Sequence, residues 1–146
     1  MVVTELTLNH IRLLAEHAPG LAKYSELKHQ AESVLVVTHI FTDSELFRTR
    51  TFSIGTTINE INGIKVKNLQ EYRAALQKGA GNKFLTILAT DNVTRASDNI
   101  FVVLPMDSLL QKEPKLAADY HYPISNTIKE VMRIAGFKAE SKQQTT

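Results

Sequence analysis

Apolar and β-branched residues gather in short runs along this chain, each bounded by turn or loop residues. The run 34–41 is continuous and β-branched, which is typical of a strand in the core of a sheet. Two further runs, 84–90 and 100–104, are joined by a polar loop, which predicts antiparallel neighbours. Shorter runs bring the prediction to at least five strands; they lie at 1–5, 56–61 and 64–66.

Turn and capping residues separate these runs and predict the helices. Asn62 and Gly63 form the strongest turn signal, because both residues tolerate the positive φ that a tight reversal requires. The clearest helix is predicted over 68–79, with Asn68 as N-cap and Glu71 reaching back as in a capping box. Further helices are predicted from the cap Thr7 to a stop at Pro19-Gly20, from Thr42 or Asp43 through Phe47, over 106–120 with an interruption at Pro114, and over 126–135 after the cap Ser125.

The composition of the chain excludes several classes of function. The chain has 146 residues, which is the usual length of one domain. The formal net charge of +2 is too low to indicate a nucleic-acid binder. No apolar run approaches the roughly 18 residues of a membrane span, and no signal peptide is visible. Cysteine is absent, which excludes disulfides and Cys-ligated zinc and leaves the compartment open. We therefore expect no membrane insertion, no nucleic-acid partner and no cofactor.

Catalytic motifs are also missing from the sequence. No serine lies in a Gly-x-Ser-x-Gly motif or in another Gly-rich setting that would supply an oxyanion hole. The histidines lack the spacing of metal ligands and are scattered at His10, His17, His29, His39 and His121. We expect no enzyme and no metal site in this chain. The alternative is a cryptic enzyme, which requires two histidines to converge with a serine or carboxylate within about 3 Å.

Two local patterns have a structural and a functional interpretation. Tyr120 and Tyr122 lie close together, and aromatic residues are good interface anchors. We expect them instead to pin the C-terminal part of the chain to the sheet. The residues 92–94 have the form of a glycosylation sequon, which has meaning only in a eukaryotic secretory context.

The order of signals between residues 34 and 88 resembles a PDZ domain of the Deg/HtrA family of trypsin-like serine proteases. The family consensus is Gly-Asp-x-Ile-x-x-Val-Asn-Gly, followed by a helix and a closing strand. This chain has Gly-Thr-Thr-Ile-Asn-Glu-Ile-Asn-Gly at 55–63, then the helix from Asn68 and the strand that begins at Phe84. The segment 2–7 is similar to the strand that follows the carboxylate-binding loop, and 100–125 is similar to the tail of the second PDZ module in tandem-PDZ Deg proteases.

The resemblance implies an α+β fold, in which a PDZ-like, partly open antiparallel β-barrel is flanked by helices and extended by a C-terminal strand and helices. It implies a PDZ-like domain at 1–125 and a C-terminal helix at 126–139, and we expect a flexible tail at 140–146. In a PDZ domain, an extended peptide adds a strand to the sheet edge beside a helix. The peptide groove would have two walls here: Val2, Val3, Thr4 and Glu5 on the strand, and Leu69, Tyr72, Arg73 and Leu76 on the helix.

Within this groove, Tyr72 and Leu76 would line the pocket and Arg73 would meet an acidic group of the ligand. The alternative is that Leu69, Tyr72 and Leu76 are core residues, an interpretation that we favour for Leu76. The protein's own chain would also abolish peptide binding if it filled the edge.

The resemblance implies a non-catalytic docking domain of a Deg/HtrA-like serine protease, with the protease activity outside this chain. The domain would assemble protomers or gate substrate access by strand addition, and its partners would be protein or peptide segments, its own protomers included. Thr56 stands where the family usually has Asp, and no Gly-rich carboxylate loop precedes Val2, which favours docking onto another protein over capture of a free C-terminus. The alternative is a free-standing PDZ-like adaptor that binds C-terminal or internal peptides.

Overall fold

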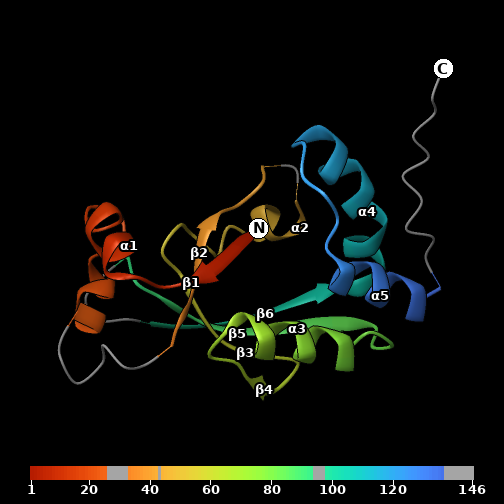
Figure 1. Cartoon of the computed structure of the whole chain (residues 1–146), viewed down its shortest axis with the longest axis horizontal. Helices are drawn as coiled ribbons and strands as arrows, with labels where there is room; N and C mark the ends of the chain where they lie inside the picture. The colour runs from red at the N-terminus through yellow and green to blue at the C-terminus, as the bar shows by residue number, and fades with distance from the viewer. Residues whose placement is uncertain (26–32, 43, 94–97, 137–146) are drawn as a thin grey trace.

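The computed structural model describes residues 1–25, 33–42, 44–93 and 98–136, and Figure 1 shows their arrangement. The chain contains both helices and strands, and its strands pair antiparallel, as in an α+β fold. In chain order they are β1 (Val2–Glu5), α1 (Leu8–Leu13), the 3₁₀-helix η1 (Pro19–Ser25), β2 (Leu35–His39), α2 (Glu45–Thr49), β3 (Thr57–Ile61), β4 (Ile64–Lys65), α3 (Leu69–Lys78), β5 (Phe84–Asp91), β6 (Asp98–Pro105), α4 (Met106–Asp119) and α5 (Asn126–Ile134).

The strands form one antiparallel sheet in the order β1-β2-β3-β5-β6, and β4 pairs with β3 alone. The sheet is not closed, because β1 and β6 stand at its two ends without pairing with each other. The helices α1 and η1 lie at one end of the molecule and α4 and α5 at the other, with α2 and α3 between them (Figure 1). The predicted mixture of an antiparallel sheet and flanking helices is therefore confirmed.

The tight turn between β3 and β4 holds three elements together. Asn62 and Gly63 have φ values of 53° and 77°, which confirms the predicted reversal. The Asn62 amide nitrogen donates to the Ala75 carbonyl at 3.2 Å, and its oxygen accepts from the Thr86 amide at 3.3 Å. A Cβ on Gly79 would lie 2.1 Å from that amide nitrogen, so only glycine fits there. The turn thereby fixes α3 against β3 and β5.

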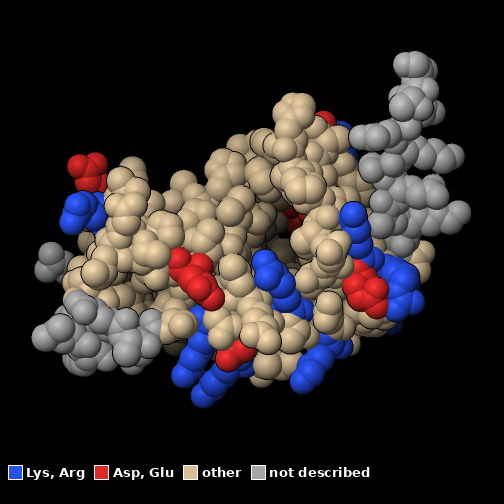
Figure 2. All heavy atoms as spheres, viewed as in Figure 1, with Lys and Arg blue, Asp and Glu red and all other residues tan. Residues whose placement is uncertain are grey.

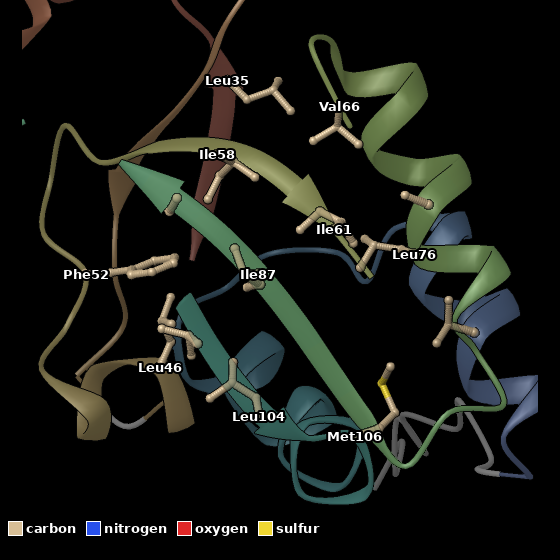
Figure 3. Packing of buried hydrophobic residues seen from close by; sticks show 14 of the residues in the cluster. Leu35, Leu46, Phe52, Ile58, Ile61, Val66, Leu76, Ile87, Leu104 and Met106 are labelled. Carbon is tan, nitrogen blue, oxygen red and sulfur yellow. The ribbon is translucent and has the colours of Figure 1, made fainter. Parts of the chain in front are cut away.

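The main core fills the space between the sheet and the helices α3, α4 and α5. Figure 3 shows Ile61, Leu76, Ile87 and Leu104 among the side chains that meet there. A smaller cluster lies on the other face of β2, where Val36 packs against Ala18 and Leu21. The first three residues of β2, Leu35–Val37, are buried on both faces and are apolar, as the prediction of a core strand required.

Two predicted helix boundaries are wrong. The first helix ends at Leu13, well before Pro19, because Leu8 and Leu13 remain exposed and little apolar surface on α1 is buried to extend it. Ser44 rather than Thr42 caps α2, through a bond from the Phe47 amide, and Asp43 lies outside the described residues.

Pro114 does not interrupt α4, which contradicts the predicted break there. A proline inside a helix removes one hydrogen bond to the carbonyl four residues earlier. Leu110 and Leu116, on either side of it, are both buried, so tertiary packing maintains the helix.

The C-terminal helix expected at 126–139 is α5, which ends at Ile134. Its cap is Ser125, as predicted, through a bond from the Ile128 amide at 3.3 Å. Val131 and Met132 are buried in the main core, so α5 belongs to the same packed unit as the sheet. The predicted tail at 140–146 lies outside the described residues.

Candidate functional site

A cavity of about 620 Å³ opens between β1, α3 and the C-terminal helices α4 and α5. Its volume falls in the range of ligand pockets, and most of its lining is apolar. Figure 2 shows a hollow near the centre of the face in view. The apolar wall comes from several elements: Val3, Leu69, Leu76, Leu85, Leu109, Leu116, Ile128 and Val131.

Six of the eight residues predicted for the groove line this cavity. Val2 and Val3 contribute from β1, and α3 contributes the other four, which are Leu69, Tyr72, Arg73 and Leu76. Leu76 is 7% exposed and belongs to the main core, so the core interpretation that we favoured for it holds. Leu69 and Tyr72 are half-buried and pack against the same core. The helix wall is thus a continuation of the core that stays open on one side.

The other two predicted residues do not line the cavity. The Thr4 hydroxyl is buried and has no hydrogen-bond partner among the described residues. The Glu5 carboxylate accepts a hydrogen bond from the Leu69 amide at 3.3 Å, at the first turn of α3. This contact satisfies a free helix amide and fastens the end of β1 to the helix that faces it.

The outer edge of β1 presents unpaired backbone groups beside the cavity. The Leu6 amide donates to Val34, and the register pairs Thr4 with Val36, so these residues bond inward to β2. In an antiparallel pair the bonding direction alternates along the strand. Val3 and Glu5 therefore direct their backbone N–H and C=O groups outward, where no other described strand pairs with them.

A carboxylate with a phenol as its hydrogen-bond partner lies in the mostly apolar wall. Glu113 of α4 accepts a hydrogen bond from the Tyr122 hydroxyl at 2.8 Å, and no described Lys or Arg forms an ion pair with it. Burial raises the pKa of Tyr72 to about 12, and the charge of Glu113 adds to the effect. Burial also raises the pKa of Tyr122, together with the hydrogen bond to Glu113. Two neutral phenols thus flank the carboxylate at ordinary pH.

At the rim, the charged groups differ in their pairing. Arg73 is exposed and forms no ion pair or hydrogen bond with another residue in the described ranges. Glu45 of α2, by contrast, pairs with Lys112 of α4 and Arg48. Arg73 is therefore a cation at the rim that a ligand carboxylate can approach.

Two tyrosines close one side of the cavity. The Phe41 ring lies 4.5 Å from Tyr120 and 5.2 Å from Tyr122, the latter stacked at an interplanar angle of 6°. The Thr42 and Tyr120 hydroxyls are 3.0 Å apart. These contacts confirm that the two tyrosines pin the C-terminal part of the chain to the sheet. The groove prediction missed this wall, although the apolar spacing over 106–120 and 126–135 could have indicated it.

The described histidines occupy separate structural positions. The His10 ring accepts a hydrogen bond from the Thr7 amide at 3.1 Å in the capping box of α1. His39 lies edge-on to Phe41, and His17 and His121 are exposed; His29 lies outside the described residues. In the described ranges, no three His, Asp or Glu side chains gather as a metal site would need, and no helix is long and apolar enough to cross a bilayer.

The sequon at 92–94 does not present an accessible asparagine. Asn92 is fully buried, and its amide nitrogen donates to the carbonyls of Gly55 and Thr90 and to the Thr57 hydroxyl. These bonds satisfy the amide inside the fold, where a glycan has no room, so Asn92 has a structural role.

No family model, curated protein or solved structure matches this chain.

Proposed function

We propose that this chain is a non-catalytic docking domain that binds an extended segment of a protein by strand addition to β1. The observation that carries the proposal is that Val3 and Glu5 direct their backbone groups outward from the sheet, and that Val3 lines the cavity between β1 and α3. An added strand would bond to these groups. Every second side chain of that strand would point toward the cavity, because side chains alternate along a strand.

The cavity lining favours one large apolar side chain in the bound segment. Leu69, Leu76 and Leu85 offer apolar contacts, and burial of a Leu- or Phe-sized side chain contributes about 1.5–3 kcal/mol. The exposed guanidinium of Arg73 favours an acidic group next to that side chain. Backbone bonds would supply affinity, and these two features would supply specificity.

The arrangement of a strand edge facing a helix is that of a PDZ-like domain, and we extend the proposal to this resemblance. The sequence 55–63 and the succession of β3, the Asn62-Gly63 turn, β4 and α3 support it. In this form of the proposal, the domain belongs to a Deg/HtrA-like serine protease and assembles protomers or gates substrate access. A free-standing adaptor for C-terminal or internal peptides is the second candidate, and the edge of β1, unfilled by any described strand, favours it.

A proline scan of β1 tests the shared mechanism of both candidates. Val3→Pro removes an outward N–H group but leaves the inward bonds of Thr4 and Leu6, and edge strands tolerate proline in such positions. The probe is a panel of labelled extended peptides that vary in one apolar and one acidic residue, with fluorescence polarisation as the readout. We expect Val3→Pro to weaken the best peptide by about tenfold or more.

Val3→Ala is the matched control, since it shortens the same side chain and keeps the N–H group. We expect it to weaken binding by about threefold or less. The proposal fails if no peptide of the panel binds the native chain, or if the proline and alanine variants, both folded by circular dichroism, bind equally well.

A further inference from the structure

The strand β6 forms the opposite end of the sheet, and its outer surface is apolar and exposed. Phe101 is 65% exposed and Val103 49% exposed, and Phe84 on the neighbouring β5 is 51% exposed. The intervening Val102 and Leu104 are buried in the main core. Phe101 and Val103 therefore lie on the face of the sheet that the described helices leave uncovered.

The backbone of β6 also has an unpaired edge. The Met106 amide donates to Lys83, and the register pairs Leu104 with Leu85, so even-numbered residues bond inward to β5. Because the direction alternates, Asn99, Phe101 and Val103 direct their N–H and C=O groups outward. Among the described residues, no strand, loop or side chain forms a hydrogen bond with these groups.

Edge strands are usually protected from pairing by charged side chains, prolines or β-bulges, and β6 has few of these features. The β5–β6 register runs without a bulge through all eight pairs, and residues 99–106 contain no charged side chain. Pro105 blocks one outward N–H, at the very end of the strand. A long, regular and apolar edge of this kind is expected to pair with another strand.

We propose that β6 is the surface through which two copies of this chain associate, as antiparallel strands related by a two-fold axis at Val102. This register pairs residues 99–105 of the two copies and places Phe101 opposite Val103 of the second copy, twice by symmetry. Both residues have outward backbone groups, so they can exchange both hydrogen bonds. Their side chains form an aromatic–β-branched pair, which is favourable across strands.

The ends of β6 fit the same register. Asn99 lies opposite Pro105 of the second copy, and the Pro105 carbonyl accepts a hydrogen bond from the Asn99 N–H. Because Pro105 has no N–H, the return bond to Asn99 is missing, but this bond would lie at the end of the paired segment. Asp98 lies beyond the paired segment, opposite the start of α4 in the second copy, so the two carboxylates do not face each other. An axis between two residues would set outward groups against inward ones. An axis at Phe101 would pair residues 98–104 with Phe101 opposite itself, and the cross-linking experiment below distinguishes that register from the proposed one. The strand is thus complementary to itself, which identifies a second copy as the partner.

This inference is independent of the proposed function, because β1 and β6 are opposite ends of the sheet. The first measurement is the mass of the full chain by sedimentation over a wide concentration range. We expect a dimer, and we expect Phe101→Arg to raise its dissociation constant about tenfold or more by placing charge at the paired strands. Leu13→Arg, at a leucine 67% exposed on α1, is the matched control and should leave the dimer unchanged.

The register is tested by cross-linking, which the absence of native cysteine makes unambiguous. A mixture of Phe101→Cys and Val103→Cys chains should form a mixed disulfide, since opposed residues lie about 5.5 Å apart between Cα atoms. Either variant alone should cross-link poorly, because like positions are diagonal and farther apart. A monomeric native chain, a dimer unaffected by Phe101→Arg, or equal cross-linking of like and unlike positions would each overturn the proposal.

Discussion

The two ends of the sheet differ in what surrounds them. At β1, a strand of four residues, Val2 and Val3 line a cavity walled by α3, α4 and α5, and the Glu5 side chain accepts a hydrogen bond from the facing helix. At β6, eight residues present an edge and an apolar face with no described wall beside them. Both ends offer backbone hydrogen bonds, but only β1 adds a pocket for a side chain.

This difference determines what each edge can select. A strand edge beside a cavity, such as β1, selects partners by the side chain that enters the cavity and by charged residues at its rim, such as Arg73. A bare edge discriminates mainly by register and symmetry, which favours an identical strand. We therefore assign a foreign segment to β1 and a second copy of the chain to β6, and mutations should separate the two.

The largest effect should come from shortening a wall residue that is also core. Leu76→Ala removes a side chain that is 7% exposed, and we expect it to lower the free energy of unfolding by about 3 kcal/mol. Phe101→Ala, at a residue 65% exposed, should cost less than about 1 kcal/mol when measured in dilute monomer. Urea unfolding followed by circular dichroism measures both. Equal losses would mean that the β6 face is packed as tightly as the cavity wall.

A smaller effect should appear when the phenol in the cavity wall ionises. Tyr72 has its pKa raised to about 12 in the folded chain, against an ordinary value near 10. Above pH 10 the unfolded chain loses this proton first, so stability is full below pH 10 and falls as the pH rises toward 12. We expect the free energy of unfolding of the native chain to fall by about 2 kcal/mol over this pH range. The fall should be smaller in Tyr72→Phe, which lacks the ionising phenol.

Absorbance titration of the tyrosines supplies a direct check. Tyr72→Phe should remove a phenol that ionises near pH 12, and Tyr122, whose pKa burial also raises, should remain as a second phenol in the high-pH step. If Tyr72→Phe leaves the high-pH step unchanged, the Tyr72 phenol is exposed to solvent, and water reaches the cavity wall at this position.

Features that depend on neighbouring residues were predictable from the sequence. The Asn62-Gly63 reversal and the caps of α3 and α5 follow from the conformations and hydrogen bonds of a few adjacent residues. The pairing of β5 with β6 followed from two apolar runs and a polar loop. The four groove residues of α3 share one cavity because their helical spacing places their side chains on a common face.

Features that depend on distant residues were not predictable in this way. The helix α4 runs through Pro114 because buried leucines on both sides hold it, and local rules alone give a break. Glu113 reaches the cavity wall through α4, a helix that no groove motif includes. The apolar run 100–104 does not reveal which face stays exposed, since Phe101 and Val102 are equally apolar in sequence. Tertiary packing decides these points.

The smallest predicted effect tests the fastening of β1 to α3. Glu5 is exposed and accepts a hydrogen bond from the Leu69 amide, at the positive end of the α3 dipole. Glu5→Gln keeps the size and an acceptor oxygen but removes the charge, so we expect a loss of about 0.5 kcal/mol that shrinks in high salt. Denaturant unfolding at two salt concentrations measures it, with Glu60→Gln on β3 as control. The contact has no electrostatic part if the loss is independent of salt, and then β1 would be held beside the cavity by packing alone.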